Sequence, residues 1–114
     1  MLDEVEGPET CNSYNMLKLT ALLQHESPEV ASYADFYERS LYNHILASQH
    51  PGEGGFVYFT PMRPQHYRVY SQVDQGMWCC VGSGLESHAR HGEFIYAHDG
   101  DALYVNLFVA STLD

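Results

Sequence analysis

Basic residues are scarce in this chain. Its 114 residues include five Lys and Arg against 15 Asp and Glu, which gives a formal net charge of −10. Proteins that bind nucleic acids or anionic membranes present clustered positive charge to the phosphate groups. The composition therefore excludes a nucleic-acid backbone and an anionic membrane surface as partners.

Long apolar runs are also missing. No stretch approaches the roughly 20 consecutive apolar residues that a membrane-spanning helix requires. The first nine residues, MLDEVEGPE, are acidic and lack both the basic start and the apolar centre of a signal peptide. We therefore expect neither a membrane span nor a cleaved leader in this sequence.

Cysteine occurs only at Cys11, Cys79 and Cys80, and no C-x-x-C pair is present. An odd number of cysteines, two of them adjacent, makes a poor disulfide framework because a bridge between neighbours is strained. One interpretation is three small buried apolar side chains, or one disulfide and a spare thiol. The other interpretation is a thiolate metal site.

A metal site would draw its fourth ligand from Glu9, which stands two residues before Cys11. Three thiolates and one carboxylate form a complete tetrahedral set, and soft sulfur ligands favour zinc over magnesium or calcium. Taken alone, Glu9 is better explained as an acidic residue that stabilises the start of a helix than as a metal ligand. Composition and spacing leave both explanations open.

Helical periodicity dominates the first half of the chain, and 45% of all residues are hydrophobic, enough for one domain core. One helix is expected over residues 10–25. A second is expected to start at Ser27-Pro28-Glu29, with Ser as N-cap and Pro at the first helical position, and to end before Pro51. The apolar positions that define them are Met16, Leu19, Leu22 and Leu23, then Val30, Tyr33, Ala34, Tyr37, Leu41 and Ile45.

The second half predicts strands and one further helix. Residues 56–60 and 67–70 are β-prone, residues 76–90 are expected to be helical, and Asp99-Gly100 separates β-prone runs at 94–97 and 103–107 as in a hairpin. This order predicts an α+β fold. Because the elements leave apolar faces without partners, we expect residues 1–114 to form a single partial domain of a larger protein.

Several motifs occur in an order that resembles a known family. They are PETCNSYNMLKLTALL, YADFYERSLYNHILASQHP, GGFVYFTPM and MWCCVGSGLESHARHGEFIYAHDGDALYVNLF. Together they resemble the catalytic region of the β-L-arabinofuranosidases of glycoside hydrolase family 127. The resemblance implies a fragment of an (α/α)6-barrel catalytic domain, with a helical hairpin followed by β-hairpins and one further helix.

The resemblance also implies roles for individual residues. The implied ligands of Zn²⁺ are Glu9, Cys11, Cys79 and Cys80. Cys79 also matches the catalytic nucleophile, and Glu38 and Tyr58 match residues that bind the sugar. The acid/base glutamate of the family lies upstream of the ETC motif and has no counterpart here. The isolated chain is therefore expected to be inactive.

The implied activity is that of a retaining, zinc-dependent glycoside hydrolase that releases L-arabinofuranose from β-linked glycans or glycoproteins. In such an enzyme the nucleophile that attacks the carbohydrate substrate would be a thiolate, deprotonated by the bound metal, in place of the usual carboxylate. The alternative is a structural zinc-binding or carbohydrate-binding module without catalysis, since a filled four-ligand shell usually marks a structural site. Apolar faces exposed on a partial domain would also favour homo-oligomers.

Histidine occurs at seven positions, to which the sequence assigns different surroundings. His44 lies beside the apolar face of the second expected helix and is expected in the core. His66, His88 and His91 are candidates for the cleft. The histidines in turn-like contexts, expected to be solvated, are His25, His50 and His98.

Overall fold

The computed structural model describes residues 5–114, so the first four residues of the acidic N-terminal segment lie outside the described part. Its elements are α1 (Thr10–Glu26), α2 (Ala31–Ser40), a π-helical turn (Leu41–Ile45), a 3-10 turn (Leu46–Ser48), α3 (Cys79–Arg90), a second 3-10 turn (His91–Phe94), β1 (Tyr96–Asp99) and β2 (Ala102–Val105). Three α-helices and an antiparallel strand pair in residues 5–114 confirm the α+β class.

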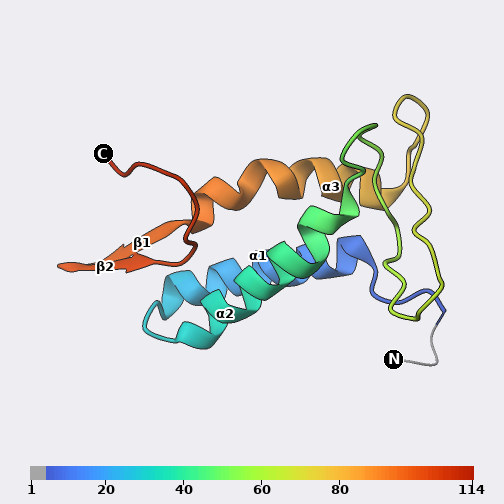
Figure 1. Ribbon diagram of the computed structural model, residues 1–114. Coiled ribbons are helices and arrows are strands. Elements are labelled where there is room, and N and C mark those ends of the chain that lie inside the picture. Colours follow the sequence, from blue (N-terminus) through green and yellow to red (C-terminus); the bar gives the residue numbers. More distant parts are fainter. Residues whose placement is uncertain (1–4) are drawn as a thin grey trace.

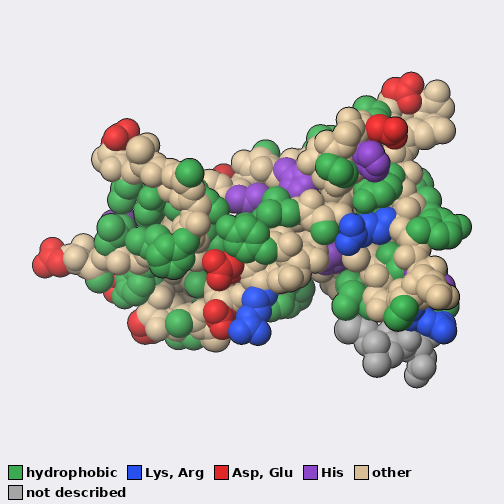
Figure 2. Space-filling view, viewed as in Figure 1, with side chains coloured by type: hydrophobic (Ala, Val, Ile, Leu, Met, Phe, Trp, Pro, Cys, Tyr) green, Lys and Arg blue, Asp and Glu red, His purple; other side chains and the backbone are tan. Residues whose placement is uncertain are grey.

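Helix α1 contacts both α2 and α3, and the long connection formed by residues 49–78 covers the ends where α1 and α3 begin. The β1–β2 hairpin and the C-terminus lie at the opposite end of the molecule (Figure 1). Apolar side chains are exposed over both ends in Figure 2. Within the described residues, none of the helices is both long and apolar enough to cross a membrane.

The helix expected over residues 10–25 forms, but its buried face differs from the leucine-based expectation. Leu19, Leu22 and Leu23 are exposed, and Leu22 reaches 66%. The buried positions of α1 are Thr10, Tyr14, Leu17, Thr20 and Gln24. Their spacing of three or four residues is helical, but polar side chains take several of the places. Leu19, Leu22 and Leu23 therefore lie on the open side of this helix, whereas Leu17 lies on its buried side.

The start of the second helix was expected at Ser27-Pro28-Glu29, and this prediction is wrong. The backbone N–H of Ser27 donates to the carbonyl of Leu23, so Ser27 closes α1. Residues 27–30 then form a turn, and α2 begins at Ala31 without a side-chain cap. Because Ser27 serves as the C-cap of α1, the N-cap of the second helix moves by three positions, from Ser27 to Val30.

The core lies where α2 and the π-helical turn pack against α1. Tyr37, Leu41 and Ile45 are buried, as the apolar spacing predicts. The Tyr37 ring stacks on Phe94, with centroids 3.8 Å apart and planes 10° from parallel. His44 is also buried, as expected, and its Nδ1 lies 2.8 Å from the hydroxyl of Ser13 on α1. A histidine hydrogen bond thus joins α1 to the turn that follows α2.

The β-prone runs at residues 56–60 and 67–70 do not form a strand pair, which corrects the sequence expectation. Their backbone groups bond to several neighbours, through isolated bridges between Val57 and Tyr70 and between Glu9 and Phe59. The N–H of Val57 donates to Ser48, 2.8 Å away, instead of to a facing strand. The prolines of the intervening loop, residues 61–64, lack the donors that a longer ladder needs.

The last two expected elements form with altered bounds. Helix α3 begins at Cys79 instead of residue 76, because the backbone of Trp78 is still extended. The Asp99-Gly100 hairpin forms as expected and pairs Tyr96 with Val105, and Gly100 takes a positive φ of 56°. Glycine accepts that conformation without steric cost.

Glycine 84 allows α3 to pack closely on Phe56. A Cβ at this position would lie 2.4 Å from the Phe56 ring, whereas a Cβ at Gly82 on the same helix would meet no atom within 4 Å. We expect Gly84→Ala to lower the free energy of unfolding by about 1–3 kcal/mol through overpacking. Gly82→Ala, the matched control, should raise it by about 0.5–1 kcal/mol through helix propensity.

Urea denaturation followed by circular dichroism measures both free energies. Equal effects of the two alanine substitutions would contradict close packing of α3 on Phe56.

Candidate active site

Four predicted ligands meet where α1 and α3 begin. Glu9 is the N-cap of α1 and Cys11 its second residue, while Cys79 and Cys80 open α3. One ligand atom from each of the four residues lies within 4.8 Å of those of the other three. Residues separated by nearly 70 positions in the sequence are therefore gathered into one cluster.

The segment around Tyr58 holds both helix starts in place. The Thr10 hydroxyl donates to the carbonyl of Val57 over 2.7 Å, and the Thr10 N–H donates to the carbonyl of Tyr58 over 2.9 Å. On the other side, the Cys80 thiol lies 3.9 Å from the same Tyr58 carbonyl. Thr10 and Cys80 are fully buried, so these contacts are shielded from water.

The cluster fits a tetrahedral metal ion. The Sγ atoms of Cys11 and Cys79 are 3.6 Å apart, and those of Cys79 and Cys80 are 4.0 Å apart. A tetrahedron with Zn–S bonds of about 2.3 Å has sulfur atoms roughly 3.8 Å apart. The thiol of Cys11 also contacts the carboxylate of Glu9. Both the spacing and the sulfur-rich donor set suit zinc.

The three thiols differ in acidity because their surroundings differ. Hydrogen bonds from the Tyr58 hydroxyl and from Cys11 lower the pKa of Cys79, and the same contact with Cys79 raises the pKa of Tyr58. Burial and the neighbouring Glu9 carboxylate raise the pKa of Cys11. Burial also raises the pKa of Cys80. Cys79 is therefore the thiol that ionises most readily.

Accessibility separates the two adjacent cysteines as well. Cys79 is exposed, whereas Cys80 is 0% exposed. Cys79 is also the first residue of α3, where the partial positive charge of the helix N-terminus favours a thiolate. One sulfur of the cluster can therefore meet a solute, and the next one cannot.

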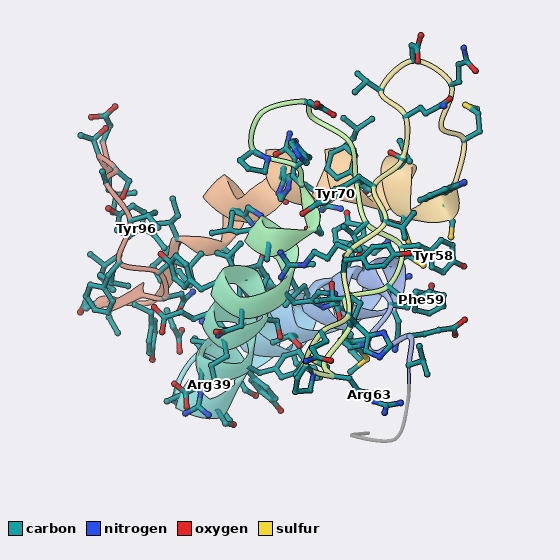
Figure 3. The ribbon with its side chains drawn as sticks, turned by 45° about the vertical axis from the view of Figure 1, so that its right-hand side comes forward. Arg39, Tyr58, Phe59, Arg63, Tyr70 and Tyr96 are labelled. Atoms are coloured by element: carbon teal, nitrogen blue, oxygen red, sulfur yellow. The ribbon has the colours of Figure 1, made fainter. Side chains whose placement is uncertain are left out.

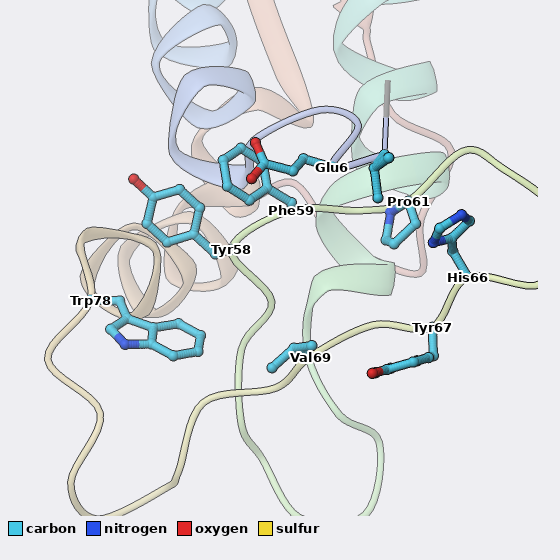
Figure 4. Close-up of a pocket in the computed structure, with 9 residues that line it drawn as sticks. Glu6, Tyr58, Phe59, Pro61, His66, Tyr67, Val69 and Trp78 are labelled. Atoms are coloured by element: carbon cyan, nitrogen blue, oxygen red, sulfur yellow. The ribbon is translucent and has the colours of Figure 1, made fainter. Parts of the chain in front are cut away.

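A groove of about 540 Å³ opens between Tyr58 and Trp78 on one side and the loop of Tyr67 and Val69 on the other (Figure 4). Trp78, which directly precedes Cys79, forms one wall, and Tyr58 belongs both to this wall and to the surroundings of the thiol. The lining residues are Val5, Glu6, Tyr58, Phe59, Pro61, His66, Tyr67, Val69 and Trp78. Figure 3 shows Tyr58 and Phe59 at the end of the molecule opposite Tyr96 of the hairpin.

The remaining predicted residues are distributed differently. Glu38 lies on α2, half-buried, and is not among the described residues that line the groove, so its sugar-binding role stays a prediction. His66 reaches the groove, as its assignment to the cleft anticipated. His88 and His91 instead lie over the core, where burial lowers the pKa of both and His91 faces the Tyr37 hydroxyl at 3.3 Å.

Two solvent assignments are confirmed, since His25 and His98 are exposed. His50 is only half-exposed, which corrects its assignment to solvent. Its Nδ1 accepts backbone N–H bonds from Gly52 and Glu53, and so caps the turn that contains them.

Sequence analysis missed the groove residues Trp78, Tyr67 and Val69. The position of the single Trp beside the paired cysteines was the available signal. The loop residues gave no periodicity from which their side of the chain could be inferred.

Comparison with known proteins places this chain in a family. The family described as Beta-L-arabinofuranosidase, GH127 catalytic domain, matches residues 2–93. The matched range contains α1, α2, α3 and the whole Glu9–Cys80 cluster. A comparison with curated proteins gives no match. A match over most of the chain shows that it belongs to the glycoside hydrolase family of β-L-arabinofuranosidase catalytic domains.

Proposed function

We propose that the protein takes part in retaining hydrolysis of β-L-arabinofuranosides, with Cys79 as nucleophile and with Zn²⁺ held by Glu9, Cys11, Cys79 and Cys80. The observation that carries the proposal is the exposure of Cys79 beside a groove, next to a buried Cys80. A filled four-ligand shell is by itself typical of a structural zinc site. Here one sulfur remains open to a substrate.

The reaction proceeds by two displacements at the anomeric carbon. The Cys79 thiolate attacks, so that a C–S bond forms while the C–O bond to the leaving group breaks and the leaving oxygen takes up a proton from the acid/base carboxyl group that the family resemblance implies. Water then gives a proton to the same carboxylate and attacks the anomeric carbon, the C–S bond breaks, and the thiolate returns. Two inversions retain the configuration of the sugar.

The surroundings of Cys79 prepare it for this role. Zn²⁺, when bound, supplies the positive charge that keeps the thiols deprotonated at neutral pH. The Tyr58 hydroxyl stabilises the Cys79 thiolate by a hydrogen bond, and the N-terminus of α3 adds its partial positive charge. Glu9, Cys11 and Cys80 fix the position of the cluster from the inner side.

We also propose that the chain forms part of a larger (α/α)6-barrel catalytic domain. The exposed leucines of α1, Leu19 and Leu22 among them, support this arrangement, because a further helix could bury them. Self-association through the same surfaces is the alternative way to cover them. The family resemblance assigns the acid/base role to a glutamate without a counterpart in this sequence. Metal binding and covalent labelling, which do not require that residue, are therefore the appropriate tests.

The metal site predicts one Zn²⁺ per chain in reduced protein purified without chelator. Cys80→Ser should weaken zinc binding by more than the roughly 10–100-fold that loss of an outer-shell partner costs, because it removes a direct ligand. Elemental analysis and competition with a chromophoric chelator measure these quantities. The matched control is Ser83→Ala on the same helix, outside the cluster. Folded, reduced protein without zinc would refute the metal site.

The nucleophile prediction concerns covalent labelling. An arabinofuranose-shaped epoxide, with its electrophilic carbon in the anomeric position, should alkylate Cys79 and leave Cys11 and Cys80 unmodified, as read by mass spectrometry of the peptides that contain Cys11 and Met77–Cys80. In a catalytically competent parent enzyme, Cys79→Ala should lower kcat by several powers of ten because the covalent route is lost. Excess zinc should partly restore Cys11→Ala and should not restore Cys79→Ala. Labelling of a carboxylate would show that the thiols are structural.

A further inference from the structure

We propose that Thr10 is a positioning residue, whose buried hydroxyl sets the spacing between the two halves of the cluster. The halves are Glu9 and Cys11 at the start of α1, and Cys79 and Cys80 at the start of α3. This inference rests on the proposed zinc site, because that site gives the spacing its function. It goes beyond the site in assigning the spacing to a residue outside the ligand set.

Thr10 lies between two of the ligands and is fully buried. It separates Glu9 from Cys11 in the sequence, and its exposed fraction is 0%. Its hydroxyl donates to the carbonyl of Val57 over 2.7 Å and lies 3.2 Å from the carbonyl of Tyr58. Water cannot replace such a partner in a buried place, so the bond is costly to break. Thr10 therefore ties the first pair of ligands to the segment of Val57 and Tyr58.

The second pair of ligands reaches the same segment from α3. The thiol of Cys80 lies 3.9 Å from the Tyr58 carbonyl, and Cys80 is as fully buried as Thr10. One carbonyl group thus faces a residue from each helix start. Helix starts that meet at a common backbone group keep a fixed separation, and the Sγ atoms of Cys11 and Cys79 lie 3.6 Å apart.

The hydroxyl of Thr10 supplies a specificity that the backbone pairing lacks. Residues 8–10 pair antiparallel with residues 58–60, through the bridge between Glu9 and Phe59. Successive residues of a strand offer the same N–H and C=O groups, so a pairing this short specifies its register weakly. A slip of one residue would reverse the faces on which the side chains lie. The side-chain bond of Thr10 distinguishes the observed register from its neighbours.

The same contacts leave the Glu9 carboxylate available to the cluster. Glu9 is the N-cap of α1, but its side chain makes no capping bond and instead contacts the thiol of Cys11. The N–H of Thr10 is one of the donors that a helix start leaves without a partner inside the helix, and Tyr58 accepts it. The segment at Tyr58 thus takes over part of the capping of α1.

Thr20 offers a matched control on the same helix. It is also buried, with an exposed fraction of 4%, and its hydroxyl donates over 2.7 Å to the carbonyl of Met16 within α1. Valine at either position removes one buried hydroxyl from α1, but only the change at Thr10 removes a bond to another segment. A general loss of helix stability affects both variants, whereas a loss of positioning affects one.

The first measurement is the zinc affinity of the reduced full chain, by competition with a chromophoric chelator. We expect Thr10→Val to weaken binding by about 10–100-fold, the usual effect of losing a partner that orients a metal ligand. Thr10→Ser keeps the hydroxyl and should bind zinc nearly as tightly as the unaltered protein, and Thr20→Val should equal it. Circular dichroism establishes that each variant is folded. Should Thr10→Val not fold, Thr10→Ala replaces it, because the smaller side chain lets water reach the Val57 carbonyl.

The second measurement reads the spacing in metal-free protein. Diamide oxidises two neighbouring thiols to a disulfide and is itself reduced to a hydrazine, and the rate depends on how often the two sulfur atoms meet. The bridge between Cys11 and Cys79 is identified by mass spectrometry of the linked peptides. It should form several times more slowly in Thr10→Val than in the unaltered protein, Thr10→Ser or Thr20→Val.

Unchanged zinc affinity in the folded variant that lacks the Thr10 hydroxyl, an equal loss in Thr20→Val, or a failure of Thr10→Ser to restore binding would overturn the inference. Failure of the proposed function has a different signature. In that case the folded, unaltered protein binds no zinc, and the rate of the Cys11–Cys79 bridge decides the role of Thr10. A slower bridge in Thr10→Val then supports the positioning role, and an equal rate overturns it.

Discussion

The arrangement of the candidate site depends on the backbone of Val57 and Tyr58. Their two carbonyl oxygens accept the hydroxyl and the N–H of Thr10, and the Tyr58 carbonyl also faces the Cys80 thiol. Carbonyl groups buried in this way need partners, since an unsatisfied buried acceptor is costly. The short extended segment therefore satisfies its own polar groups by bringing the starts of α1 and α3 together.

This arrangement also explains why the segment is not part of a regular sheet. A strand in a regular ladder bonds to its facing strand through alternate residues in a repeating register. The segment instead divides its hydrogen bonds between α1 and the residues after the π-helical turn. Its side chains have separate roles: the Phe56 ring packs against α3 at Gly84, whereas the Tyr58 hydroxyl lowers the pKa of Cys79.

The sequence predicted local features better than their assembly. The hairpin at Asp99-Gly100 and the buried positions Tyr37 and Ile45 follow from turn chemistry and periodicity, which act over a few residues. The identity of the cluster around Cys79 followed from family resemblance, because spacing alone left a structural alternative. The cluster forms because the starts of α1 and α3 lie together in the fold. The two starts are nearly 70 residues apart in the sequence, so no local sequence pattern predicts this contact. The prediction that Leu19, Leu22 and Leu23 form the buried face of α1 was wrong for a related reason. Which side of a helix is buried depends on the elements that pack against it, and not on hydropathy alone.

The contact between Gly84 and Phe56 has a consequence for the direction of the two adjacent thiols. Cys80, Gly84 and Ser87 share the buried face of α3, and successive residues of a helix are turned by about 100°. The close approach at Gly84 therefore sets the rotation of the helix about its own axis. That rotation points Cys80 inward and leaves Cys79 outside. Which of two chemically identical neighbours is free to react is thus decided more than one helical turn away, by the absence of a side chain.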